Sequence, residues 1–357
     1  MTTQKRWAVW AVFVAALVNC GHHAALHEAD AGSDAGLDAG GLTPDAGPAP
    51  ADGGVPDGGL VWRQVSPCPQ GRFEAMGTAV NGKLLVVGGF ITGALATTSR
   101  VDVYDPVTDT WTQRTDFPGP QTHAGVEVDG NTVYFAGGFY TGVSGSNSQV
   151  WTYDFAADAW DAGLALPLQR AALALVRVGR QLHAVGGLAM DGQSDSADHT
   201  VLDLDSADGG WTYLAPLPNP RNHLGGAVAG NLLVIAGGRH NWDEAAGNQV
   251  ETDVFDPDAG TWTRGADLAL GRSEIGAATF SIGPKMVVVG GSHNPATPSA
   301  DVSLYDPVAN AWQALTPLPG PRKGAVAALI GNQIVVTTGS PTGTDPATTT
   351  WIGCCVP

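Results

Sequence analysis

The segment YDPVTDTWTQ, from Tyr104 to Gln113, returns about two hundred residues later as YDPVANAWQA, from Tyr305 to Ala314. Its tryptophan recurs at intervals of about fifty residues, at Trp62, Trp111, Trp160, Trp211, Trp262 and Trp312. A fixed interval of this length indicates a chain built from repeated supersecondary units. The phrase therefore predicts shape, and any chemistry has to be sought outside it.

Three further marks repeat with the tryptophan. A glycine pair recurs at Gly88-Gly89, Gly137-Gly138, Gly186-Gly187, Gly237-Gly238 and Gly290-Gly291, with Gly339 as a degenerate sixth copy. An aromatic residue or leucine precedes aspartate at Tyr104-Asp105, Tyr153-Asp154, Leu204-Asp205, Phe255-Asp256 and Tyr305-Asp306. An arginine precedes each glycine pair by about sixteen residues at Arg72, Arg170, Arg221, Arg272 and Arg322, and Gln121 takes its place in the second copy.

Each unit is consistent with four short antiparallel strands. The second strand, for example LLVIAGG at residues 232–238, is a continuous apolar run, which is typical of a strand buried on both faces. The glycine pair permits positive φ where the backbones crowd together. The aspartate after the aromatic residue favours a tight turn into the fourth strand. The aromatic residue and the tryptophan are expected to pack between adjacent units.

These marks resemble the Kelch repeat, and the resemblance covers the chain from about Val61 to its end. It implies an all-β fold, a six-bladed β-propeller of four-stranded antiparallel blades at residues 61–357. Trp62 precedes every glycine pair, and the last unit ends without a second turn and tryptophan. We therefore expect the N-terminal strand, Val61 to Val65, to complete the last blade and close the ring.

The first twenty residues have the features of an export signal. Lys5 and Arg6 precede an apolar run that is too short for a comfortable membrane span. The run ends at LVNC, which resembles the bacterial lipoprotein lipobox, although Asn19 departs from the usual small residue. The resemblance implies a signal peptide at 1–20 and lipidation of Cys20, with an ordinary secretory signal as the alternative. Gly21 favours the outer membrane or cell surface.

Residues 21–60 are rich in Asp, Ala, Gly and Pro and contain almost no large apolar side chain. Such a segment cannot offset the entropy of ordering, so we predict a disordered linker that spans on the order of 35 Å. Its aspartates do not have the spacing of a calcium-binding loop. The formal net charge of −17 excludes nucleic acid as an expected partner and leaves the N-terminal lipid as the only expected membrane contact.

Three cysteines follow Cys20, namely Cys68, Cys354 and Cys355. An exported protein can form disulfides, and three thiols leave at least one unpaired. A bridge from Cys68 to the C-terminal pair would staple the termini together, but the expected strand register places them too far apart. A vicinal Cys354–Cys355 bridge and three free thiols are the alternatives.

In an antiparallel blade, the residues after the glycine pair and those just after the arginine lie at the same end of the strands. The resemblance implies that this rim and the mouth of the central channel are used for binding. The polar and aromatic candidates expected there are Glu74, His123, Phe139, Tyr140, His223, Arg239, His240, Trp242, Arg272, Glu274 and His293. The alternative is that they are ordinary solvated rim residues.

We expect a monomeric, extracytoplasmic binding module for a protein or carbohydrate ligand, without catalysis and without a cofactor. No nucleophile elbow, phosphate-binding loop or zinc-protease motif is present in the sequence. The alternative is a cofactor-free, sugar-acting enzyme that resembles the sialic acid mutarotases, with Glu274 or His223 as acid–base and Arg239 or Arg272 holding a carboxylate. We expect no metal site, because ligands two blades apart are not expected within about 4–5 Å.

Overall fold

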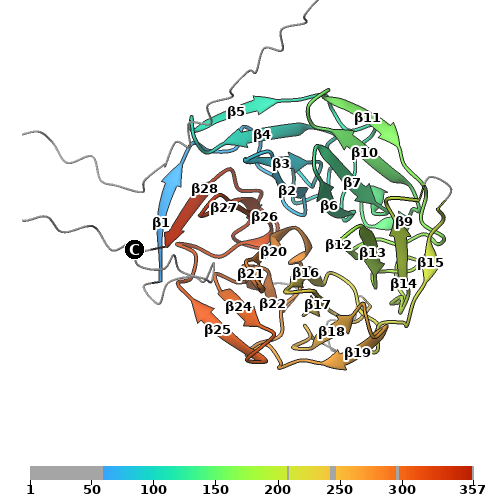
Figure 1. Ribbon diagram of the computed structural model, residues 1–357. Coiled ribbons are helices and arrows are strands. Elements are labelled where there is room, and N and C mark those ends of the chain that lie inside the picture. The colour runs from blue at the N-terminus through green and yellow to red at the C-terminus, as the bar shows by residue number, and fades with distance from the viewer. Residues whose placement is uncertain (1–58, 207–208, 242–246, 295–296, 356–357) are drawn as a thin grey trace, which may run out of the picture. The chain divides into compact units, whose positions relative to one another are not determined.

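The computed structural model describes residues 59–355, with gaps at 207–208, 242–246 and 295–296. These residues form six four-stranded antiparallel sheets arranged as a ring (Figure 1). The predicted six-bladed, all-β propeller is therefore confirmed. The predicted signal peptide, Cys20 and nearly all of the predicted linker lie outside the described residues. Within the described ranges, no helix is both long and apolar enough to span a membrane.

The first five blades follow one another along the chain. Blade one comprises β2 (Met76–Val80), β3 (Lys83–Val87), β4 (Val101–Asp105) and β5 (Thr110–Gln113). Blade two comprises β6 (Gly125–Asp129), β7 (Thr132–Ala136), β10 (Val150–Asp154) and β11 (Ala159–Ala162). Blade three comprises β12 (Ala174–Val178), β13 (Gln181–Val185), β14 (His199–Asp203) and β15 (Thr212–Tyr213). Blade four comprises β16 (Gly225–Ala229), β17 (Leu232–Ala236), β18 (Thr252–Asp256) and β19 (Thr261–Arg264). Blade five comprises β20 (Thr279–Ile282), β21 (Lys285–Val289), β24 (Val302–Asp306) and β25 (Ala311–Leu315).

Three short elements interrupt this order. A 3-10 turn, η1 (Gly276–Ala278), precedes the innermost strand of blade five. Two small hairpins follow glycine pairs: β8 (Phe139–Thr141) with β9 (Ser144–Ser146), and β22 (Ser292–Asn294) with β23 (Thr297–Pro298). The hairpins lie in the loops that sequence analysis assigned to the rim.

The sixth blade combines the two ends of the described chain. Its strands are β26 (Lys323–Ile330), β27 (Gln333–Ser340), β28 (Thr350–Cys355) and β1 (Leu60–Val65). Strand β1 lies beside β28 in Figure 1, with a register that runs from Leu60 opposite Cys355 to Val65 opposite Thr350. The side chains of Leu60 and Val65 are both buried. The predicted closure by the N-terminal strand is thus confirmed.

The repeated tryptophans join neighbouring blades. Trp111 donates its indole N–H to the carbonyl of Ser66 at 3.0 Å, and Trp160 donates to Thr115 at 3.0 Å. The other four copies make the same bond to the preceding unit: Trp62 to Thr316, Trp211 to Leu164, Trp262 to Ala215 and Trp312 to Ala266. Each tryptophan therefore packs as a wedge and also fixes the angle between two blades through a directional bond.

The turn aspartate accepts a backbone hydrogen bond two residues ahead. In blade one, Asp105 Oδ1 accepts from the N–H of Val107 at 2.9 Å. In blade three the equivalent acceptor is Asp203, which accepts from Asp205, and Leu202 lies opposite Leu182 in the ladder. The assignment of Leu204-Asp205 to this role was wrong. The sequence LDLD offers two overlapping copies of the pattern, and only the strand register selects between them.

The arginine that begins a repeat is a framework residue. Arg72 forms an ion pair with Asp102 and donates to the carbonyl of Arg100 at 2.9 Å. Arg221 forms the same kind of pair with Asp253 at 2.6 Å. All four charged side chains of these two pairs are almost fully buried. In both blades the arginine thus pairs with carboxylate or backbone groups of its own blade.

Blade three contains a buried histidine pair. His183 Nδ1 lies 2.9 Å from His199 Nε2, and His199 Nδ1 lies 3.2 Å from the Ala215 carbonyl. Both side chains are fully buried, and the ring of Phe255 packs against His199 with a centroid distance of 4.6 Å. Burial lowers the pKa of His183 to about 4. Burial, together with the charge that His183 would carry, lowers the pKa of His199 to about 3.

The histidine pair predicts an acid-sensitive blade. An unfolded histidine titrates near pH 6.5, so between about pH 6.5 and 4 the unfolded chain binds protons that the folded chain excludes. The contribution of each buried histidine to the free energy of unfolding is fully present above pH 6.5 and falls by ~1.4 kcal/mol per pH unit as the pH decreases toward the folded pKa. His183→Val/His199→Val copies the residues of sister strands, Val234 and Val101. We expect this double variant to show a clearly shallower loss of urea midpoint between pH 6.5 and 4, whereas an unchanged slope contradicts the assignment.

The cysteines are settled in part. Cys68 is a buried free thiol, and Cys354 is disulfide-bonded. A bridge between Cys68 and the C-terminal pair is therefore excluded, as is the alternative in which all three thiols are free. The vicinal Cys354–Cys355 bridge stays a prediction.

Candidate functional site

Six equivalent residues, one from each blade, surround the axis at one end of the channel. Each lies two positions after the arginine of its repeat, or after Gln121 in the second repeat, and each has a left-handed backbone with φ between 51° and 60°: Glu74, His123, Ala172, His223, Glu274 and Gly324. Neighbours are joined by backbone hydrogen bonds, such as the Glu274 N–H to the His223 carbonyl at 2.9 Å and the Glu74 N–H to the Gly324 carbonyl at 2.8 Å. We call these six residues the axial ring. Five of them are not glycine, so the ring holds side chains in a conformation that L-residues rarely adopt.

A second layer comes from the residue that follows the glycine pair. This residue pairs with the one directly after the arginine, as Phe73 does with Phe90 and Asn222 with Arg239. The same position holds Phe90, Phe139, Leu188, Arg239 and Ser292 in the first five blades. An arginine at a position that is apolar in three sister blades is not required by the fold. Arg239 is therefore a candidate for a specific role.

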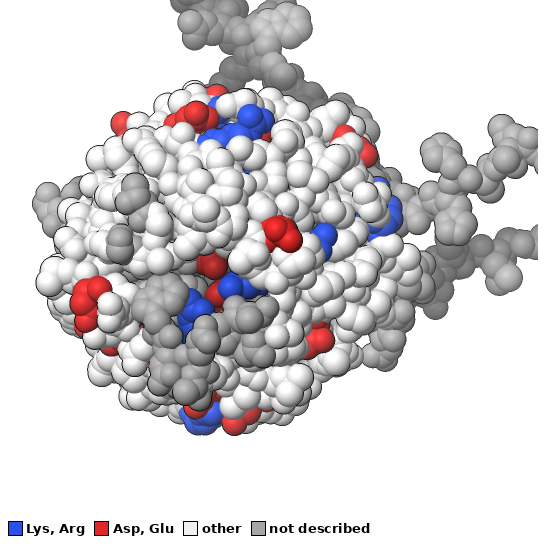
Figure 2. All heavy atoms as spheres, turned by 180° about the vertical axis from the view of Figure 1, so that it is seen from behind, with Lys and Arg blue, Asp and Glu red and all other residues white. Residues whose placement is uncertain are grey.

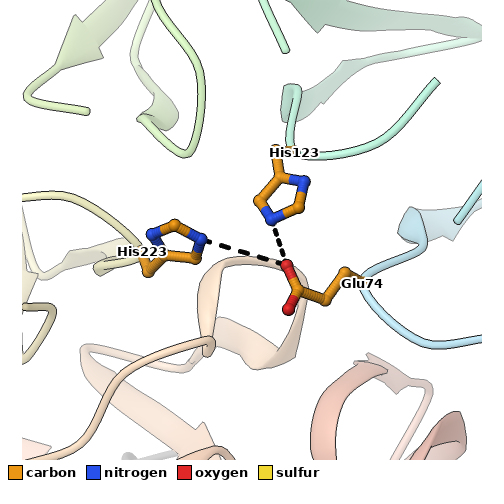
Figure 3. Close-up of side chains that lie close together, drawn as sticks. All are labelled: Glu74, His123 and His223. Carbon is orange, nitrogen blue, oxygen red and sulfur yellow. Dashed lines mark ion pairs between the residues drawn. The ribbon is translucent and has the colours of Figure 1, made fainter. Parts of the chain in front are cut away.

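Three ring side chains point toward one another (Figure 3). His123 Nε2 is in direct contact with Glu74 Oε2, and His223 Nε2 lies 4.0 Å from the same oxygen. The two imidazoles meet edge to face with centroids 5.0 Å apart. Phe139 packs against His123 at 5.2 Å and closes the pocket around that ring. These contacts form a compact acid–imidazole cluster.

The fourth polar ring residue binds two cations. Glu274 accepts from Arg239 Nη1 at 3.1 Å and pairs with Lys323 Nζ at 3.0 Å. Burial and the nearby charge of Glu74 raise the pKa of Glu274. Burial alone would raise the pKa of Glu74 too, but the interaction with His123 and the charges of Lys323 and Arg239 outweigh it and hold that pKa low. Figure 2 shows a face on which acidic and basic side chains meet near the centre, surrounded mostly by uncharged surface.

The hydrogen bonds of His223 define its tautomer. Arg239 Nη2 lies 3.1 Å from His223 Nε2, and a guanidinium can only donate, so Nε2 is an acceptor. Nδ1 then carries the proton and donates to Asn222 Oδ1. Burial, with the positive charge of Arg239, lowers the pKa of His223 well below its usual value. His223 is therefore neutral at neutral pH and directs a lone pair toward the axis.

A cavity of about 510 Å³ fills the channel beneath the axial ring. All six ring residues line one end of it, and the innermost strands supply walls composed mainly of Ala, Gly, Val and Leu. Arg177 and Ser281 line the other end, where Arg177 is half-buried and Ser281 is exposed. Because the ring end is buried, the cavity opens to solvent at the far ends of the innermost strands. It has a polar closed end and an apolar wall, as ligand pockets commonly do.

The structure brings five of the predicted site residues together: Glu74, His123, His223, Arg239 and Glu274. Their convergence was expected, but the expectation that positions two blades apart stay beyond about 4–5 Å was wrong. Ligand atoms of Glu74, His123 and His223 all lie within 4.8 Å of one another. The axial ring is narrow because backbone hydrogen bonds join adjacent blades directly. Sequence analysis missed Lys323, which occupies the position after the arginine in the last repeat.

The other predicted residues lie outside this polar group, although Phe139 borders it at His123. Arg272 is in the framework, where it donates to Ser303 Oγ at 2.7 Å, and Phe139 is fully buried. Tyr140 is 40% exposed on the β8–β9 hairpin. Two histidines on the loops bind carboxylates, His240 with Asp195 at 3.2 Å and His293 with Asp301 at 2.8 Å. Trp242 lies outside the described residues.

Comparison with known proteins agrees with this architecture. A model described as the Kelch motif matches residues 77–118 and 276–319. The Kelch-like protein terF of Aspergillus terreus is 28% identical over 282 residues, which are 74% of this chain and 60% of that protein. The human Kelch repeat and BTB domain-containing protein 13 is 32% identical over 166 residues, which are 46% of this chain and 35% of that protein. Mouse Kelch-like protein 36 is 26% identical over 231 residues, 63% of this chain and 36% of that protein.

The chain is thus a six-bladed β-propeller that carries Kelch repeat motifs. It spans 60% of the first of these relatives and about a third of the other two.

Proposed function

We propose that this protein is a non-catalytic binding module whose propeller holds a protein partner at the rim around the axial ring. The observation that carries the proposal is the polar group of Glu74, His123, His223, Arg239 and Glu274, which converges at the end of the channel that this rim surrounds and in which only Glu74 and His123 are partly exposed. Buried charges are unfavourable unless they are paired, and sister blades place Ala172 and Gly324 at the same ring positions. The fold therefore does not require these side chains, and a recognition role accounts for them.

The loops around the ring support a role in recognition. The blades repeat the same framework, whereas the loops after the glycine pairs differ in length and chemistry, from FITG at residues 90–93 to SHNPATP at residues 292–298. A rigid scaffold with variable loops at one end is a common arrangement for binding surfaces. Met190 on the third of these loops is 70% exposed, and Tyr140 on the second is 40% exposed.

The proposal also includes the place where the module acts. The apolar run, the LVNC sequence and the acidic linker support export and attachment through a lipid on Cys20. A tether on the order of 35 Å would hold the propeller away from the membrane and leave its rim accessible. Metabolic labelling with a radioactive fatty acid tests this part, because a Cys20→Ser chain should not be labelled.

Site-specific photocrosslinking tests the binding face. A photoreactive amino acid at Met190 should capture a protein from the envelope of the source cells. The same amino acid at Val308 should not, although Val308 is 92% exposed, because it lies in the β24–β25 turn at the opposite end of the strands. Equal capture at both positions would remove the rim from consideration. If the propeller binds to a carbohydrate array and no protein is crosslinked, the ligand is a glycan and not a protein.

A further inference from the structure

We propose that Glu74, His123 and His223 bind a divalent transition-metal ion, with Zn²⁺ as the reference case, at the closed end of the central cavity. The ligand atoms are Glu74 Oε2 and the two Nε2 atoms, and all lie within 4.8 Å of one another. Two imidazoles and one carboxylate are a common ligand set for zinc. The proposal uses three residues of the polar group that supports the binding function at the rim, but its test, metal binding by the isolated chain, does not depend on a protein partner.

The backbone already fixes the ligand positions. The three residues belong to the axial ring, share the left-handed conformation and come from blades one, two and four. Bonds of about 2.0–2.1 Å to one tetrahedral ion would place ligand atoms about 3.4 Å apart. His223 Nε2 lies 4.0 Å from Glu74 Oε2 and would move closer, whereas the direct contact of Glu74 with His123 would open. Side-chain rotations that move the ligand atoms by less than about 1.5 Å bring both distances to this value.

The histidines are oriented in the way that metal ligands usually are. His123 Nδ1 is hydrogen-bonded to Thr122 Oγ1 at 2.8 Å, and His223 Nδ1 is hydrogen-bonded to Asn222 Oδ1. In both cases the partner is the residue directly before the histidine, so each Nε2 is directed to the axis. Hydrogen bonds at the far nitrogen fix ring orientation and favour ligation through the near nitrogen.

The surrounding charges determine which ion fits. Arg239 and Lys323 both pair with Glu274, so Glu74 supplies the negative charge nearest to the ion. An ion must also displace the Arg239 donor from His223 Nε2. A hard cation that depends on several carboxylates is disfavoured by this environment, whereas Zn²⁺, Cu²⁺ and Ni²⁺ gain from imidazole ligands. We therefore expect Zn²⁺ to bind and Mg²⁺ and Ca²⁺ to fail.

The cavity gives the ion an open coordination position. Glu74, His123 and His223 all line the 510 Å³ cavity, so the fourth position faces its interior. Zinc sites with three protein ligands and one open position hold water or a ligand there. A small molecule with a metal-binding group could therefore enter along the apolar wall and complete the coordination sphere.

The experiment uses the full chain in which His22, His23 and His27 of the predicted linker are changed to Gln, because those imidazoles could bind zinc themselves. After chelator treatment, calorimetric titration should show one Zn²⁺ per chain, and Co²⁺ should give the visible absorption of a tetrahedral site. Glu74→Gln, His123→Asn and His223→Asn should each weaken binding at least tenfold. Glu251→Gln, the same type of change away from the ring, should bind as the parent chain does.

Arg239→Met supplies a test of opposite sign. It removes the donor that competes for His223 Nε2 and should tighten Zn²⁺ binding several-fold, an effect that general destabilisation would not produce. The melting temperature without metal shows which variants fold. If the histidine variants do not fold, Zn²⁺ binding by Glu74→Gln tests the proposal. Absence of stoichiometric binding by the parent chain, or unchanged binding by Glu74→Gln, overturns the proposal.

Discussion

A chain that begins at Gly71 should unfold at a markedly lower temperature than one that begins at Gly59. The shorter chain lacks β1 (Leu60–Val65) and leaves β28 without its outer neighbour. It loses the burial of Leu60 and Val65, the ladder to β28 and the Trp62 bond to Thr316. Together these contribute on the order of 5 kcal/mol, which corresponds to a melting temperature lower by about 8 °C in a domain of this size.

The comparison contains its own control. Starting the chain at Gly59 removes residues 1–58 and keeps all the strands described above, so its melting temperature should match that of the full chain. Adding β1 back as a separate peptide, Gly59 to Gln70, should restore part of the loss in a concentration-dependent way. If the two truncated chains melt at the same temperature, the N-terminal strand does not close the ring in solution.

Arg221→Gln should destabilise the propeller by about 3–5 kcal/mol, because it leaves the carboxylate of Asp253 buried without its cation. The chain indicates how to repair the damage, since blade three places Thr200 where blade four has Asp253. The double variant Arg221→Gln/Asp253→Thr should therefore recover much of the loss. The urea midpoint of unfolding measures both effects.

An exposed ion pair provides the comparison for Arg221. Arg180 is 46% exposed and bridges Asp129 and Asp205, so Arg180→Gln should change stability by less than about 1 kcal/mol. If Arg221→Gln and Arg180→Gln have equal effects, the arginine of the repeat is not a framework residue.

The blades could be predicted because the recurring residues have the same structural role in nearly every copy. The tryptophan, the glycine pair and the turn aspartate each make one kind of backbone contact or allow one backbone conformation. The prediction failed only where the sequence offered two registers, at Leu202-Asp203 and Leu204-Asp205. Cross-strand pairing distinguishes them, and no local pattern in one strand contains that information.

For the candidate site, the sequence predicted which residues converge but not how close together they lie. Antiparallel strands bring Glu74, His123, His223 and Glu274 to one end, and that follows from topology. The distances between these side chains depend on the left-handed backbone of the axial ring. That conformation cannot be predicted from a sequence position that is not glycine.

Three residues show where the direction of a side chain could not be predicted. Arg272 and Phe139 were expected at the rim, but Arg272 donates to Ser303 within its blade and Phe139 is fully buried against His123. Lys323 was not predicted because the repeat pattern places the second residue after the arginine at the ring, whereas in the last repeat the first residue also pairs with the cluster. In each case the residue type was informative, but the direction of the side chain depended on the neighbouring blade.

The axial ring also has a consequence for engineering. Its six residues share one backbone conformation, and backbone hydrogen bonds join most neighbours, so side chains at this end of the channel can be exchanged one at a time without redesigning any loop. Ala172 and Gly324 are the two ring positions without a polar side chain. Ala172→His would add a third imidazole between those of His123 and His223, and substitutions of this kind could change which ligand the scaffold binds.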